Sequence, residues 1–131
     1  MNYLLDTDVL VDLLRGDPIV IENLKQKNIV IGEEFISVLS VFELMEGAYL
    51  ANRESELILI KELINTLYVL NLNQKIASEA GKISSFLKKK GKNIGTGDIL
   101  IGATAVVENK ILITRNSKHF SAIPNIKLTS W

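Results

Sequence analysis

Short apolar segments alternate with longer amphipathic ones along the whole chain, and this alternation limits the fold more than any other feature. The short segments have the length of strands and cover 2–5, 35–39, 68–72, 111–114 and, more weakly, 126–128. The segments between them are long enough for helices. Strands that alternate with helices pair in parallel, and the helices then cover both faces of the sheet. The sequence therefore predicts a three-layer α/β sandwich with a mostly parallel sheet of four or five strands.

Capping residues predict where the helices begin. A side chain that accepts hydrogen bonds from the first free backbone N–H groups marks a helix start. Such side chains precede several amphipathic segments, and they are Asp8, Asp17, Ser40, Asn73 and Asp98. The expected helices cover 9–15, a segment that starts at 18, 41 to about 51, 53–67, 74 to the lysines at 88–90, and 99 to about 109. Glu43 follows Ser40 by three residues, which completes a possible capping box.

Length and composition exclude several classes of protein. The chain has 131 residues, of which 47% are hydrophobic, so we expect a single globular domain over 1–131. Without cysteine it has no disulfide framework, no thiolate nucleophile and no sulfur-based zinc site. No signal peptide and no apolar stretch of membrane-spanning length is present, so we expect a cytoplasmic protein. A formal net charge of zero gives no overall attraction to nucleic acid, so local charges or a bound metal must provide it.

Acidic side chains follow the predicted strands. Asp6 comes after the first strand and Glu43 lies in the first turn after the second. Asp98 stands at a helix start, and 114–116 follow the fourth strand. Because the carboxyl ends of parallel strands meet at one edge of a sheet, these residues are expected to converge there. Clustered carboxylates repel one another unless a divalent cation neutralises them, so this pattern indicates a metal site.

Each acidic residue also has a purely structural interpretation. Asp6 could close a turn after its strand, and Asp8 could cap the following helix. Glu43 could serve only the capping box. Asp98 could be an N-cap, although the preceding Gly95-Thr96-Gly97 also allows the backbone to approach a ligand closely.

Four segments together resemble the ordered motifs of a known family. They cover residues 4–16, 37–44, 98–105 and 114–120, and they resemble PIN-domain ribonucleases, most closely the VapC-type toxins of toxin–antitoxin pairs. The resemblance implies an endoribonuclease that depends on Mg²⁺ or Mn²⁺, forms a homodimer and is restrained by a VapB-type antitoxin. By position, Asp6, Glu43 and Asp98 match the acidic residues that hold the metal. Family members often have a further acid after the fourth strand, where this chain offers Asn116 and His119, which leaves the number of metal ions open.

Phosphodiester hydrolysis suggests supporting roles for other residues near these motifs. Thr114 and Asn116 could orient water or phosphate by hydrogen bonds, and Arg115 could pair with a phosphate. Thr7 and Asp8 are further supporting candidates because they directly follow Asp6. The basic run at 88–90 is either a solvated helix end or an RNA contact. His119 is more typical of a surface or packing residue than of a catalytic base.

Two other functions compete with the nuclease. Asp6 and Asp8 flank Thr7 after a first strand, as in phosphatases with an aspartyl nucleophile, but the Asp-Asp pair of such sites is missing. Alternatively, the carboxylates could all be structural and the chain could be a protein-binding module without catalysis. Neither the RNA that is cleaved nor the role of Trp131 follows from the sequence.

Overall fold

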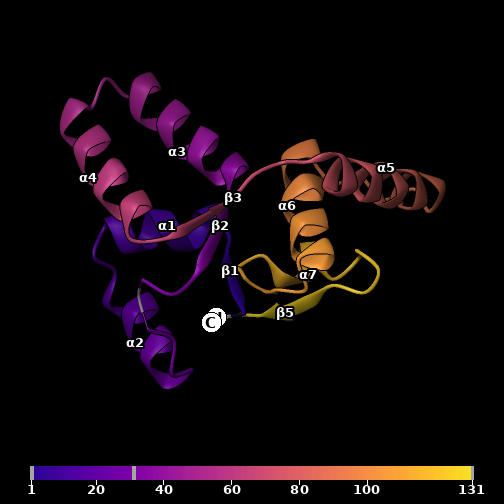
Figure 1. Ribbon diagram of the computed structural model, residues 1–131, viewed down its shortest axis with the longest axis horizontal. Helices are drawn as coiled ribbons and strands as arrows, with labels where there is room; N and C mark the ends of the chain where they lie inside the picture. Colours follow the sequence, from indigo (N-terminus) through magenta and orange to yellow (C-terminus); the bar gives the residue numbers. More distant parts are fainter. Residues whose placement is uncertain (1, 31, 131) are drawn as a thin grey trace.

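A parallel sheet of five strands forms the centre of the computed structural model, which describes residues 2–30 and 32–130 (Figure 1). Each strand pairs in parallel with its neighbours, in the order β3-β2-β1-β4-β5. The strands are β1 (Tyr3–Leu5), β2 (Phe35–Ser37), β3 (Tyr68–Leu70), β4 (Ile111–Ile113) and β5 (Lys127–Thr129). The predicted parallel sheet is confirmed, and it has five strands where four or five were expected.

Helices cover both faces of this sheet. One face carries α1 (Thr7–Leu14), α2 (Pro18–Gln26), α3 (Val38–Leu50) and α4 (Glu54–Asn65), which lie to the left of the strands in Figure 1. The other face carries α5 (Gln74–Lys89), α6 (Thr96–Val107) and the short α7 (Ser117–Phe120). Since successive side chains of a strand point to opposite faces, Leu4 belongs to the second core and Leu5 to the first. This is the predicted three-layer sandwich.

Two of the predicted helix starts are confirmed by their capping hydrogen bonds. Asp17 Oδ1 accepts from the Ile19 N–H at 2.9 Å, and Asn73 Oδ1 accepts from the Ile76 N–H at the same distance. The apolar stripe that follows Asn73 is buried along the whole of α5, in contact with α6 and the sheet, and comprises Ile76, Ala80, Ile83 and Leu87. Local spacing was therefore sufficient to define this helix.

Three other predicted caps are wrong. α1 begins at Thr7 with Asp6 as its N-cap, α3 begins at Val38 with Ser37 as its N-cap, and α6 begins at Thr96 after Gly95. Asp8, Ser40 and Asp98 therefore lie inside the first turns of their helices. For α1 and α3 the reason is that β1 and β2 lead almost directly into these helices, so the N-cap is the hydrogen-bond acceptor nearest the end of the strand. Ser40 and Glu43 form no capping box.

The remaining differences concern the ends of elements. β2 and β3 each end two residues earlier than predicted, and β5 is shifted one residue toward the C-terminus. The short helix α7 was not predicted. In the described part of the chain, no helix is long and apolar enough to cross a membrane. The expectation of a single domain over 1–131 stays a prediction, and Trp131 lies outside the described residues.

Candidate active site

The order of the strands changes direction at β1. From there the chain adds β2 and β3 on one side and later places β4 and β5 on the other. Ligands of open α/β sheets bind beyond the carboxyl ends of the strands at such a switch point. Asp6 follows β1 and Thr114 follows β4, and the Thr114 hydroxyl donates to Asp6 Oδ2 at 2.8 Å. Two of the predicted site residues therefore meet where the topology favours a ligand.

Ionisation of the Asp6 carboxyl group is unfavourable in this position. Its side chain is buried, and burial is the main cause that raises its pKa from 3.8 to about 7. The negative charge of Asp8 raises this pKa further, and that of Asp98 adds a smaller contribution. Hydrogen bonds from the Thr114 hydroxyl and the Thr7 N–H oppose the shift without cancelling it. A cation next to Asp6 would favour its charged form.

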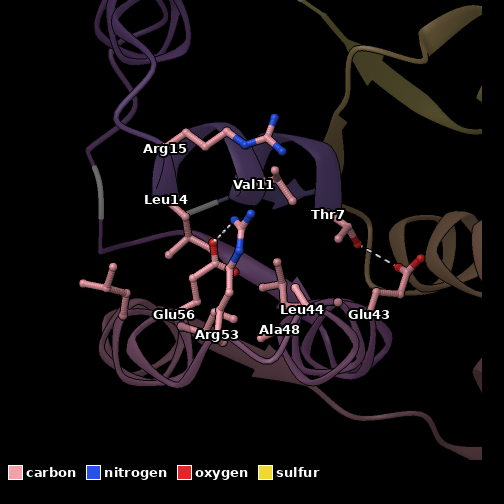
Figure 2. A pocket seen from close by; sticks show the side chains of 13 residues that line it. Thr7, Val11, Leu14, Arg15, Glu43, Leu44, Ala48, Arg53 and Glu56 are labelled. Atoms are coloured by element: carbon pink, nitrogen blue, oxygen red, sulfur yellow. Dashed lines mark hydrogen bonds and ion pairs between the residues drawn. The ribbon is translucent and has the colours of Figure 1, made fainter.

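Glu43 reaches the same edge of the sheet from α3. Its Oε1 accepts a hydrogen bond of 2.8 Å from the Thr7 hydroxyl, which Figure 2 shows as a dashed line between α1 and α3. The Thr7 Oγ1 also lies 2.9 Å from the hydroxyl oxygen of buried Ser40. Glu43 is thus held by the residue next to Asp6 in sequence, and it makes no contribution to the start of its own helix.

Asp98 joins this edge from the first turn of α6. Its Oδ2 lies 3.1 Å from Nε2 of His119 on α7, and both side chains are half-buried. The His119 ring packs edge-on against buried Phe120, with their centroids 5.9 Å apart. His119 is therefore a packing residue, and it also contacts one of the candidate metal ligands.

Asp8, Asp12 and Arg115 form an ion-pair network beside Asp6. The backbone N–H of Arg115 donates to Asp8 Oδ2 at 3.1 Å, and Arg115 Nε lies 4.0 Å from the same oxygen. Arg115 Nε is nearer to Asp12 Oδ2, at 3.3 Å. The next residue, Asn116, donates its backbone N–H to the Thr114 hydroxyl at 2.9 Å. The segment after β4 is therefore tied to α1 at several points.

A cavity of about 340 Å³ opens next to Thr7 and Glu43, between α1, α3 and α4 (Figure 2). Its apolar lining comprises Val11, Leu14, Leu44, Ala48, Leu59 and Ile60. Gly47, Ala51, Arg15 and an ion pair between Arg53 and Glu56, with 2.9 Å between Nη1 and Oε1, complete the lining. The cavity therefore has a largely apolar lining and opens beside Glu43, one of the carboxylates at the edge of the sheet.

The donors at this edge are suited to a hard cation. Among residues 2–30 and 32–130, no three Asp, Glu, His or Cys side chains are close enough to hold one ion together. Mg²⁺ does not require this, because it is usually bound by one or two carboxylates and keeps several waters. In the same part of the chain, the buried Oδ1 of Asp8 has no hydrogen-bond partner. The residues fit an open, partly hydrated Mg²⁺ or Mn²⁺ site and do not fit a closed cage.

Two contributors to the site were missed in the sequence. Asp12 was not among the candidate residues, yet it is 3% exposed and ion-paired with Arg115. Its signal was the spacing of four from Asp8, which places both carboxylates on one face of a helix. Ser40 was assigned to a cap and instead contacts Thr7. No short motif marks that contact, because it joins α1 to α3.

Comparison with known proteins agrees with this geometry. The family model of the PIN domain matches residues 3–126. "Ribonuclease VapC1" of Haemophilus influenzae (strain R2866) is 31% identical over 132 residues, covering 100% of this chain and 98% of the relative. "Ribonuclease VapC19" of Mycobacterium tuberculosis is 34% identical over 125 residues, covering 95% and 96%. The structure of VapBC2 from Rickettsia felis, bound to a promoter DNA fragment, superposes with a TM-score of 0.87 at 30% identity, covering 100% and 99%.

The chain therefore belongs to the PIN-domain family and, within it, to the VapC proteins. The resemblance seen in the four motifs is confirmed, and so is the fold that it implied.

Proposed function

We propose that this protein is a metal-dependent endoribonuclease that hydrolyses RNA phosphodiester bonds and acts as the toxin of a toxin–antitoxin pair. The observation that carries the proposal is the arrangement at the switch point, where Asp6 is bonded to Thr114 and Glu43 to Thr7. The names of the relatives, Ribonuclease VapC, support the same activity. They favour it over an aspartyl-nucleophile phosphatase and over a binding module without catalysis. We also propose that the enzyme acts in the cytoplasm, because cellular RNA is present there.

We propose that Asp6, Glu43 and Asp98 surround Mg²⁺ or Mn²⁺, with one or two of these carboxylates binding the ion directly and the others binding its water molecules. When bound, such an ion lowers the pKa of a water molecule and neutralises the charge that develops on the phosphate. The chain itself positions the ligands, because Thr114 orients Asp6, Thr7 orients Glu43 and His119 contacts Asp98. Asn116 has an exposed side chain beside Thr114 that can donate to a phosphate or to water. Arg115 adds a positive charge on the same segment.

Cleavage assays test the proposal directly. The purified protein is expected to cleave single-stranded or looped RNA with Mg²⁺ or Mn²⁺ and to lose this activity in excess EDTA. A preparation of Asp98→Asn, purified in the same way, controls for contaminating nucleases. Cleavage that continues in EDTA at the wild-type rate, and is absent from that control, would contradict a metal-dependent mechanism.

A VapB-type antitoxin is the partner that we propose for the cavity and the acidic edge. The solved relatives include VapBC2 from Rickettsia felis and VapBC-1 from nontypeable Haemophilus influenzae. The apolar lining between α1, α3 and α4 suits apolar side chains, and the carboxylates next to it suit arginine or lysine. We also propose a homodimer, because Phe42, Tyr49 and Leu50 leave a large apolar area of α3 exposed.

Filling the cavity is expected to weaken antitoxin binding. Gly47 lines the cavity, and a Cβ at this position would meet no atom within 4 Å. Gly47→Phe should therefore fold and weaken antitoxin binding roughly tenfold or more, because the ring occupies space that the partner needs. The measurement is the dissociation constant for a purified VapB-type antitoxin. Gly81→Phe is the matched control, since Gly81 is a helical glycine of α5 that is equally free of neighbours and outside the cavity. Equal loss in both variants would contradict this placement.

A further inference from the structure

Arg115 is held by acidic side chains at only one part of its guanidinium group. Both of its ion pairs, to Asp12 and to Asp8, are made by Nε. Within residues 2–30 and 32–130, its two terminal nitrogens donate no hydrogen bond, and the side chain is 51% exposed. The two N–H groups at the end of an arginine form a fork that matches two oxygens of a phosphate. The part of Arg115 that suits a phosphate is therefore the part that the protein leaves open.

Apart from Arg115, no ion-pair partner in the described part of the chain accounts for the burial of the Asp12 carboxylate. Burying a carboxylate is costly unless a charge or hydrogen bonds compensate it, and Asp12 is 3% exposed. In the described part of the chain its only ion pair is with Arg115 Nε, and its Oδ2 accepts no hydrogen bond. A buried carboxylate that was only structural would be expected to bond the backbone or a cap. This carboxylate instead pairs with Arg115 on the segment that follows β4.

The position of Arg115 ties this ion pair to the candidate active site. The preceding residue, Thr114, donates to Asp6, and the Arg115 N–H donates to Asp8. Asp8 and Asp12 are four residues apart on α1, so both carboxylates act on the guanidinium from one helix face. The two ion pairs consequently draw the guanidinium group toward α1, beside the edge of the sheet where an RNA phosphate would lie.

We propose that Asp12 is a positioning residue that, together with Asp8, holds Arg115 as a fixed fork for an RNA phosphate next to the bond that is cleaved. This inference rests on the proposed ribonuclease function. Asp12 itself touches no RNA in this arrangement. The rival interpretation is that the ion pair only attaches the segment after β4 to α1, and it predicts a loss of stability without a specific loss of RNA affinity.

The sign of the effect of Asp12→Asn separates the two interpretations. Removing a negative charge near an RNA site should by itself tighten RNA binding. If Asp12 positions Arg115, Asp12→Asn should instead raise KM for RNA cleavage by about threefold to fivefold with little change in kcat. Glu22→Gln removes the same charge from the exposed surface of α2 and is the matched control. We expect its KM to be unchanged or slightly lower.

Arg115 variants keep the test decisive even if Asp12→Asn folds poorly, because the Arg115 side chain is half exposed. Arg115→Ala is expected to raise KM about tenfold, and Arg115→Lys should recover only part of this, since lysine has the charge without the fork. The slope of log(kcat/KM) against log salt should fall by about 0.7 in Arg115→Ala, the loss of one phosphate contact on a single strand. Adding Asp12→Asn to Arg115→Ala should cause no further rise in KM.

Three results would overturn the inference. They are a KM for Asp12→Asn at or below that of wild type, full recovery by Arg115→Lys, or additive effects in the double variant. A wild-type protein that cleaves no RNA with Mg²⁺ or Mn²⁺ would instead remove the proposed function itself. The two failures are therefore distinguished by the wild-type assay alone.

Discussion

Replacing Asp6 by asparagine is expected to lower the rate of RNA cleavage by about 1,000-fold or more, and Asp98→Asn should have a similar effect. A metal ion contributes several kcal/mol of transition-state stabilisation, and each 1.36 kcal/mol corresponds to a tenfold change in rate. An amide oxygen is a weaker ligand for Mg²⁺ than a carboxylate and carries no charge to neutralise the ion. The measurement is kcat for a defined RNA substrate with saturating Mg²⁺.

The fold should survive the Asp6→Asn change. The amide oxygen can still accept from the Thr7 N–H, and the amide nitrogen can donate to the Thr114 hydroxyl, whose own proton can turn toward Asp8 Oδ2 at 3.4 Å. Asp17→Asn is the matched control, because it removes the same charge from a residue that caps α2 and asparagine caps equally well. A kcat for Asp6→Asn within tenfold of wild type would remove Asp6 from the proposed metal site.

The same substitution is expected to stabilise the metal-free protein at alkaline pH. The pKa of Asp6 is about 7 in the folded state and 3.8 is its ordinary value, so the folded state binds this proton more tightly. The stability that this proton contributes is complete below about pH 4 and is lost as the pH rises through 7. Asp6→Asn has no such loss. It should exceed wild type by roughly 0.5–2 kcal/mol at pH 8, with the difference vanishing toward pH 4.

Chemical denaturation in EDTA at several pH values, followed by thermal unfolding with Mn²⁺, measures both parts of this prediction. Wild type should gain melting temperature from Mn²⁺, because the ion binds only the folded state, and Asp6→Asn should lose most of that gain. Asp17→Asn should behave as wild type in both experiments. If Asp6→Asn instead melts well below wild type in EDTA and responds normally to Mn²⁺, Asp6 is structural and the metal site fails at its central residue.

Local patterns were enough for the layers and for the order of the candidate site residues. Apolar runs of strand length between amphipathic segments led to a parallel sheet covered on both faces, because this arrangement buries both kinds of segment. The stripe of α5 and the caps at Asp17 and Asn73 follow from spacing and acceptor type alone. Asp6, Glu43 and Asp98 could be placed near one edge because parallel strands end on the same side. That they share one metal ion stays a prediction.

Only the tertiary structure decided where three helices begin and which side chains meet. The caps of α1 and α3 moved from Asp8 and Ser40 to Asp6 and Ser37, because strand pairing fixes where β1 and β2 end and the nearest acceptor then caps. Strand order was equally invisible in the sequence, and it brings Thr114 to Asp6 across 108 residues.

Asp12 is the clearest example of a residue whose spacing was visible in the sequence but whose contacts depended on the tertiary structure. Its spacing from Asp8 was visible in the sequence, but its meaning depended on a cation from the segment after β4. The free energy of a buried charge is set by its partner, and the partner is chosen by the fold. The sequence by itself thus determined which elements form and which acidic residues follow the strands, while the order of the strands determined the contacts that these residues make.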